Sequence, residues 1–158
     1  MKDLPVRKSN RLKGHDYSKA GCYFVTMCAK DGHELFGEFV GATALGRPRI
    51  ELTPLGTCIN ETIQIANRDG VKIEAYVIMP NHIHMIVCLE RDTGDRGRSP
   101  LQQIVRNMKS YVTKWAGFSP WQRSFHDHVI RNEIEYQKIW QYIEMNPVRW
   151  EEDCYYAK

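Results

Sequence analysis

The chain has 158 residues, of which 42% are hydrophobic and 26% charged. This length is enough for one domain with its own hydrophobic core, and we expect a single domain over residues 1–158. No stretch approaches the roughly 18 consecutive apolar residues of a membrane span, and residues 1–20 lack the apolar segment of a signal peptide, so we expect a cytoplasmic protein with no membrane partner. The five cysteines are odd in number and widely spaced, which indicates neither a disulfide framework nor a zinc ribbon.

The net charge of +3 is small, but the basic residues are clustered. Residues 1–20 form a polar arm with six Lys or Arg, and residues 96–123 carry six more with no Asp or Glu. Two basic segments on a nearly neutral chain can follow nucleic-acid phosphates, or they can be ordinary solvated faces.

The first elements after the arm are predicted from residue type and spacing. The β-branched and aromatic run Cys22–Ala29 predicts a strand, and residues 37–52 predict a Gly-rich hairpin. Thr53 is a suitable N-cap and Pro54 a suitable first residue for a helix that ends near Asn67.

The middle of the chain predicts two strands and a helix. The apolar runs 71–79 and 82–90 are joined by a Pro-Asn turn and should pair as neighbours. A polar loop over residues 91–100 precedes an amphipathic helix predicted over residues 101–115.

The last part of the chain is irregular and then extended over residues 119–130. Asn132 then caps a final helix, with Glu135 as its capping-box partner, and the helix must end near Pro147. The order of elements predicts an α+β fold, an antiparallel sheet with helices packed on one face.

Two histidines lie in an otherwise apolar strand, in the stretch MPNHIHMIV. Because side chains alternate along a strand, His82 and His84 point to one face, while Ile83 and Met85 point toward the helices. Two imidazoles side by side are typical of a metal site. They can equally be half-buried histidines that are simply hydrogen-bonded.

A second pair, His126 and His128, flanks Asp127. If this segment is extended, the two histidines share a face and could bind metal. Asp127 would then have to point toward the core, so we expect the segment at a sheet edge and rank this pair second.

The final helix carries Tyr142 and Asn146, which lie four residues apart and therefore on one face. Ile139 and Ile143 form an adjacent apolar stripe that would pack the helix down. Tyr142 and Asn146 thus border the buried face, where a side chain can reach a neighbouring active site. Alternatively, they are a flanking aromatic residue and a polar residue before Pro147.

The stretches YVIMPNHIHMIV, WQRSFHDHVIRNE and YQKIWQYIEMNPVRW, in this order, resemble the HUH single-tyrosine transposases, in which U is a hydrophobic residue. Within that superfamily they resemble the REP-associated tyrosine transposases of the IS200-like group. The similarity covers nearly the whole chain. It implies a ferredoxin-like domain, with the catalytic tyrosine on a C-terminal helix, that binds single-stranded DNA hairpins of palindromic repeats.

The resemblance also implies residue roles and a reaction. Tyr142 matches the nucleophile, and His82, His84 and Asn146 match the ligands of a divalent metal, Mg²⁺ or Mn²⁺, although imidazoles alone would favour zinc or another late transition ion. Strands would be cleaved and rejoined through a 5′-phosphotyrosine intermediate, by a monomer or a homodimer.

Basic side chains on the arm and on the helix over residues 101–115 are candidates for phosphate contacts. They are Arg7, Lys8, Arg11, Lys13, Arg106 and Lys109. Trp115, Phe118 and Trp121 could stack on unpaired bases or pack in the core.

Two other functions are compatible with these residues. One is a hairpin-binding module that does not use catalysis. The other is a hydrolytic metallonuclease with a metal-activated water, in which Tyr142 is structural and no covalent adduct forms.

Overall fold

A computed structural model describes residues 12–17, 19–42, 44–68, 70–90 and 99–156. Arg7, Lys8, Arg11 and most of the loop predicted over residues 91–100 lie outside these ranges. Within them, no helix has the length and apolar content needed to cross a bilayer.

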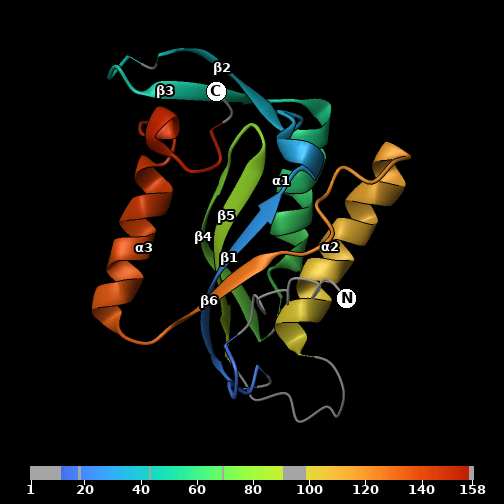
Figure 1. Ribbon diagram of the computed structural model, residues 1–158, viewed down its shortest axis with the longest axis vertical. Helices are drawn as coiled ribbons and strands as arrows, with labels where there is room; N and C mark the ends of the chain where they lie inside the picture. The colour runs from blue at the N-terminus through green and yellow to red at the C-terminus, as the bar shows by residue number, and fades with distance from the viewer. Residues whose placement is uncertain (1–11, 18, 43, 69, 91–98, 157–158) are drawn as a thin grey trace, which may run out of the picture.

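The main sheet is antiparallel and has the strand order β4-β5-β1-β6 (Figure 1). Its strands are β1 (Gly21–Cys28), β4 (Val71–Ile78), β5 (His82–Leu89) and β6 (His126–Ile130). β2 (Gly37–Ala42) and β3 (Pro48–Leu52) form the predicted hairpin as a separate two-stranded sheet.

Three α-helices and two short 3₁₀ helices complete the fold. The α-helices are α1 (Pro54–Ala66), α2 (Pro100–Ala116) and α3 (Glu133–Met145), and the 3₁₀ helices are η1 (Lys30–Gly32) and η2 (Trp150–Glu152). With the β2–β3 hairpin and the 3₁₀ helices set aside, the order is βαββαβ followed by α3, which confirms the predicted ferredoxin-like α+β fold. α1 and α2 cover one face of the sheet, and α3 lies over the opposite face (Figure 1), so the prediction that the helices pack on one face holds for α1 and α2 but not for α3.

The two faces of β5 have different roles. Ile83, Met85 and Val87 belong to the main hydrophobic core, which α1 and α2 cover. Because side chains alternate along a strand, His82 and His84 point to the other face, toward α3, as the sequence predicts.

The helix starts follow local sequence signals. Thr53 caps α1 by accepting a hydrogen bond from the Gly56 amide at 3.1 Å, and Asn132 caps α3 by accepting from the Glu135 amide at 2.8 Å. The Glu135 carboxylate does not complete the predicted capping box with Asn132. It accepts instead from the Arg131 amide at 2.8 Å, one residue earlier.

The structure contains a disulfide between Cys22 and Cys88. The expectation that the cysteines form no disulfide is wrong for this pair. The two residues are direct partners in the register of β1 and β5, 66 residues apart in sequence, so their spacing along the chain gave no indication of their proximity. Cys28 and Cys58 are buried, as expected for small core residues, and Cys154 is exposed.

Candidate active site and metal centre

The site is built on the face of the sheet that α3 covers. His82 and His84 stand side by side on β5, with ring centroids 4.5 Å apart, and both are buried, at 0% and 1% exposed. They occur where β5 pairs with the end of β1, opposite Cys28 and Thr26.

Each imidazole is held by its Nδ1 atom. His82 Nδ1 lies 2.8 Å from Asn81 Oδ1, and His84 Nδ1 lies 2.8 Å from Thr26 Oγ1. Because an amide oxygen can only accept, His82 Nδ1 must carry the hydrogen, which leaves the lone pair on Nε2. A histidine that ligates a metal is usually fixed in this way by the bond its other nitrogen makes.

The two histidines are neutral at physiological pH. Burial lowers the pKa of His82 to about 4, although the charge of Asp153 acts in the opposite direction. Burial and the neighbouring His82 lower the pKa of His84 to about 3. Neutral imidazole is the form that binds a metal ion.

α3 brings the two predicted residues of the C-terminal helix to the same place. The Tyr142 hydroxyl lies 3.3 Å from His84 Nε2 and donates a hydrogen bond to Asp153 Oδ2 at 3.0 Å. The Asn146 amide nitrogen donates to the same carboxylate oxygen at 2.6 Å. The structure therefore places His82, His84, Tyr142 and Asn146 in one cluster.

Asp153 is the residue of the site that the sequence analysis missed. Its carboxylate is buried against the histidines, with Oδ2 4.0 Å from His82 Nε2. Ligand atoms of His82, His84 and Asp153 lie within 4.8 Å of one another, an arrangement able to hold a metal ion. In the sequence Asp153 follows Glu151 and Glu152, which are exposed, and nothing in this acidic run distinguishes it from a solvated surface segment.

Asp153 remains ionised in this setting. Burial alone would raise its pKa, but the Tyr155 amide, which donates at 2.9 Å, and the Asn146 and Tyr142 side chains stabilise the carboxylate, and the net effect lowers its pKa. Burial and the charge of Asp153 both raise the pKa of Tyr142, so its phenol is neutral.

Two polar atoms of the cluster indicate where an ion would bind. Four buried side-chain atoms of the described residues have no hydrogen-bond partner: the two carboxylate oxygens of Asp127 on β6 and, within the cluster, His82 Nε2 and Asn146 Oδ1. Burying such groups without a partner is unfavourable, and a cation would satisfy both. The donor set of two imidazoles, an amide oxygen and a carboxylate therefore fits a divalent ion.

The C-terminal segment covers the histidines. The Trp150 ring stacks on His82 with centroids 5.6 Å apart, and the Tyr155 ring lies 4.6 Å from His82 on the same measure. Asn81 holds this segment by donating to the Tyr155 carbonyl at 2.8 Å. In this conformation the ligand atoms of the histidines are shielded from solvent.

The alternative histidine pair has another role in the structure. His128 on the edge strand β6 donates a hydrogen bond from Nε2 to the Glu135 carboxylate at 2.6 Å, which ties β6 to the first turn of α3. Asp127 pairs with Val25 in the β1–β6 register and points to the α2 side, as expected for an edge strand. Within the described ranges, the sole cluster of three metal-binding side chains is that of His82, His84 and Asp153.

Of the predicted DNA contacts, the three that the structure describes, Lys13, Arg106 and Lys109, are not part of this cluster. Lys13 is exposed. Arg106 and Lys109 lie on α2, which covers the other face of the sheet. Of the predicted stacking residues, Trp121 packs in the core at 6% exposed, whereas Trp115 and Phe118 are about half exposed, at 54% and 53%.

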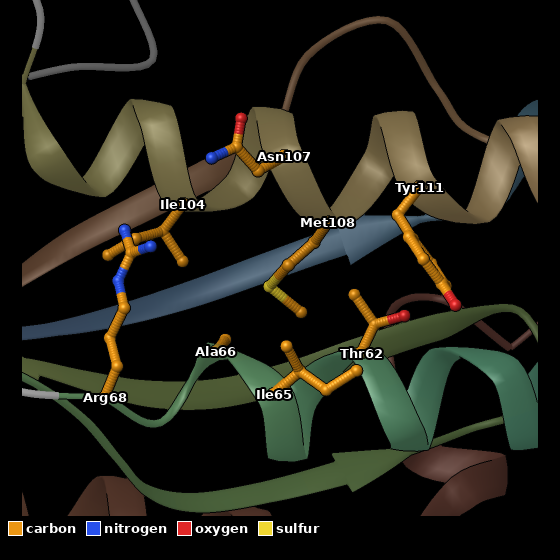
Figure 2. Close-up of a pocket in the computed structure, with 8 residues that line it drawn as sticks. All are labelled: Thr62, Ile65, Ala66, Arg68, Ile104, Asn107, Met108 and Tyr111. Carbon is orange, nitrogen blue, oxygen red and sulfur yellow. The ribbon is translucent and has the colours of Figure 1, made fainter.

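A separate groove, of about 250 Å³, lies between α1 and α2, and Figure 2 draws the residues that line it. Its lining includes exposed Ile65 and Tyr111, with Met108 at its floor and Arg68 at one end. Because α1 and α2 cover the face of the sheet opposite the histidines, this groove is not part of the metal cluster.

No protein-family model matches the chain. A protein of Haemophilus influenzae named "Uncharacterized protein" is 33% identical over an alignment of 174 positions. This alignment covers 96% of this chain and 93% of that protein. A protein of Escherichia coli named REP-associated tyrosine transposase is 33% identical over 88 residues, which cover 55% of this chain and half the length, 50%, of that relative.

A solved structure has the same fold over most of this chain. It is described as a REP-associated tyrosine transposase bound to a REP hairpin, and it matches with a TM-score of 0.65 and 26% identity over 89% of this chain and 74% of that one. In fold and in sequence the chain is therefore similar to REP-associated tyrosine transposases.

Proposed function

We propose that this protein is a metal-dependent tyrosine transposase that recognises DNA hairpins of palindromic repeats, cleaves a single strand beside the hairpin and rejoins strands. The observation that carries the proposal is the position of the Tyr142 hydroxyl, 3.3 Å from His84 Nε2 and hydrogen-bonded to Asp153. A nucleophile beside a set of metal ligands suits phosphoryl transfer. The hairpin substrate is inferred from the relative whose structure is described as bound to a REP hairpin.

In the proposed reaction the Tyr142 oxygen attacks the scissile phosphorus. The bond from that oxygen to phosphorus forms, and the bond from phosphorus to the 3′ oxygen breaks, which leaves a 5′-phosphotyrosine and a free 3′-OH. Asp153 Oδ2 accepts the phenol hydrogen bond at 3.0 Å and so orients the hydroxyl. The phenol proton passes to water, and the departing 3′ oxygen takes up one proton from water. A phenolate, with an ordinary pKa near 10, is a better leaving group than an alkoxide, so a DNA 3′-OH can reverse the step and rejoin strands.

The metal would be held by His82, His84, Asn146 and Asp153. A bound Mg²⁺ or Mn²⁺ would supply Lewis acid chemistry, because it withdraws negative charge from the non-bridging phosphate oxygens. The Nδ1 contacts with Asn81 and Thr26 keep both imidazoles in the orientation that ligation needs.

Basic side chains are proposed to bind the phosphates of the DNA. Those taken from the sequence are Arg7, Lys8, Arg11, Lys13, Arg106 and Lys109. We also propose that residues 150–155 move when DNA enters, because Trp150 and Tyr155 cover His82 in this conformation.

The test is the formation of a covalent adduct. Purified protein is mixed with labelled single-stranded oligonucleotides that contain a palindrome and its flanks, with Mg²⁺ or Mn²⁺, and resolved on denaturing gels. The variants Tyr142→Phe and His82→Ala are compared with Tyr136→Phe, which removes another tyrosine hydroxyl from the same helix. We expect a metal-dependent, SDS-resistant adduct in the wild type and in Tyr136→Phe, and none in the other two variants.

Two results would contradict the proposal and identify the alternatives. Cleavage that persists in Tyr142→Phe without an adduct would indicate a hydrolytic metallonuclease. Tight hairpin binding with neither cleavage nor adduct, in either metal, would indicate a binding module.

A further inference from the structure

Asn81 lies in the turn between β4 and β5, directly before His82, and is only 3% exposed. Its side chain makes three hydrogen bonds. Oδ1 lies 2.8 Å from His82 Nδ1, and the amide nitrogen donates to the carbonyls of Gly32 at 3.2 Å and Tyr155 at 2.8 Å. One buried amide therefore joins the histidine of the metal cluster to η1 and to the C-terminal segment.

The two carbonyls decide which way the Asn81 amide faces. A backbone carbonyl can only accept, so the group that faces Gly32 and Tyr155 must be the NH₂ group, and its two hydrogens satisfy both carbonyls. The amide oxygen is then left to face His82 Nδ1, which must carry the ring hydrogen. The lone pair of His82 therefore lies on Nε2, the nitrogen within the metal cluster, because carbonyls distant in sequence orient Asn81.

The Gly32 carbonyl is the fixed partner of Asn81. Ala29 ties the two residues together, because its amide donates to the Asn81 carbonyl at 2.8 Å and its own carbonyl accepts from the Gly32 amide at 3.3 Å. The turn itself has left-handed backbone at Asp31 and Gly32, with φ of 58° and 72°. Such a conformation is uncommon outside glycine and persists where the surrounding structure holds it. None of these contacts involves the C-terminal segment.

The Tyr155 carbonyl is the partner that can leave. It belongs to the segment whose rings lie against His82. When this segment moves, the amide nitrogen of Asn81 loses one acceptor, and the freed hydrogen can bond to water. The Gly32 carbonyl still holds the NH₂ group, so Oδ1 continues to face His82. The site can therefore open without a change in the tautomer of this histidine.

We propose that Asn81 is a positioning residue with two separable roles. Its Oδ1 holds His82 in the tautomer that binds a metal, and its amide nitrogen holds the C-terminal segment over the site, while the Gly32 carbonyl keeps the amide oriented when that segment leaves. This inference rests on the proposed function, which supplies the metal and the movement of residues 150–155.

Two substitutions at this position separate the roles. Asn81→Asp keeps the shape of the side chain and an oxygen that accepts from His82, but it has no N–H group for the two carbonyls. Asn81→Ala removes both functions. The control is Asn67→Ala, because the Asn67 side chain also accepts a hydrogen bond, from the Ile73 amide at 2.7 Å, and it is not part of the metal cluster.

The first measurement is the tautomer of His82 in the metal-free protein, read by long-range ¹H–¹⁵N NMR at a mildly alkaline pH. We expect hydrogen on Nδ1 in the wild type, in Asn81→Asp and in Asn67→Ala, and loss of this fixed tautomer in Asn81→Ala. The affinity for Mn²⁺, measured by calorimetry, should fall about 10–100-fold in Asn81→Ala, the usual effect of losing the partner of a ligating histidine. It should stay near wild type or become tighter in Asn81→Asp.

The second measurement is hydrogen–deuterium exchange of residues 150–156, followed by mass spectrometry. Exchange should be faster in both Asn81 variants than in the wild type and in Asn67→Ala, because both variants lose the donor to the Tyr155 carbonyl. Asn81→Asp should therefore combine an unchanged His82 tautomer with a more open segment. A general loss of structure would not produce this combination.

Several results would overturn the proposal. Hydrogen on Nε2 of His82 in the wild type, or a wild-type tautomer and Mn²⁺ affinity in Asn81→Ala, would refute the first role. Wild-type exchange of residues 150–156 in Asn81→Asp would refute the second. If Asn81→Ala does not fold, the wild type and Asn81→Asp still test both roles. If the wild type binds Mn²⁺ but forms no DNA adduct, the proposed reaction fails, and these measurements still test Asn81.

Discussion

Replacing Asp153 by Asn tests whether this carboxylate is a metal ligand. The change preserves the size of the side chain and removes its charge. In the structure Oδ2 accepts from Tyr142 and Asn146, and Oδ1 accepts from the Tyr155 amide. An asparagine has one acceptor oxygen, so at least one of these donors loses its partner. A hydrogen bond to a charged group contributes about 1.5–3 kcal/mol, so the free energy of unfolding without metal should fall by about 2 kcal/mol or more.

The decisive quantity is the stabilisation that metal adds. An ion present at about 100 times its Kd raises the free energy of unfolding by about 2.7 kcal/mol. If loss of the carboxylate weakens binding about tenfold, that gain falls to about 1.4 kcal/mol at the same ion concentration. The assay is urea unfolding followed by tryptophan fluorescence, with Mn²⁺ and with a chelator.

The control is Glu152→Gln, which removes the exposed carboxylate next to Asp153 and should keep the full gain from Mn²⁺. His82→Ala should abolish the gain. The reasoning is refuted if Asp153→Asn keeps the wild-type gain while His82→Ala loses it, because Asp153 would then lie beside the ion without binding it.

Three further predictions concern stability and access. The disulfide Cys22–Cys88 closes a loop of 66 residues, so its reduction should lower the free energy of unfolding by about 4 kcal/mol. Thiol titration of the unfolded, unreduced protein should find three of the five cysteines free. The pKa values of His82 and His84, about 4 and 3, lie below the ordinary 6.5, so their contribution to stability is complete above pH 6.5 and is lost as the pH falls toward 4. Urea unfolding of the metal-free protein should show a loss of about 3 kcal/mol at pH 4 for each imidazole that titrates. Tyr155→Ala should uncover His82, and diethyl pyrocarbonate should then modify this histidine faster than in the wild type.

Each of these predictions has a contrary outcome. Five free thiols, or a stability that reducing agent does not change, would contradict the disulfide. A stability that is constant between pH 7 and about pH 4.5 would contradict the burial of neutral imidazoles, since such groups must take up protons on unfolding. An unchanged modification rate in Tyr155→Ala would show that the C-terminal segment does not shield His82.

Local periodicity explains which parts of the site could be predicted from the sequence. His82 and His84 share a face because side chains alternate along a strand, and Tyr142 and Asn146 share a face because residues four apart are neighbours on a helix. Both relations depend on the backbone conformation of one element. The hydrophobic pattern and the cap at Thr53 likewise depend on neighbours in sequence. The limits predicted for α1 and β5 are therefore close to the observed ones.

The features that were missed depend on contacts between distant segments. Asp153 reaches the histidines because the chain turns back after α3, a path that no periodic pattern encodes. Cys22 and Cys88 meet through the register of two strands. Lys109 is drawn to the carbonyls of segment 119–125, so its charge is used within the protein, which its place on the polar side of a helix does not reveal.

The most direct test of the account is to identify the atom that carries the DNA. The adduct formed with a hairpin oligonucleotide is digested with protease and nuclease, and the modified peptide is sequenced by mass spectrometry, with labels placed on either side of the cleavage point. The account predicts a nucleotide joined through its 5′ phosphate to the peptide that contains Tyr142, with a free 3′-OH on the released strand. A linkage at another residue, or through a 3′ phosphate, would contradict it.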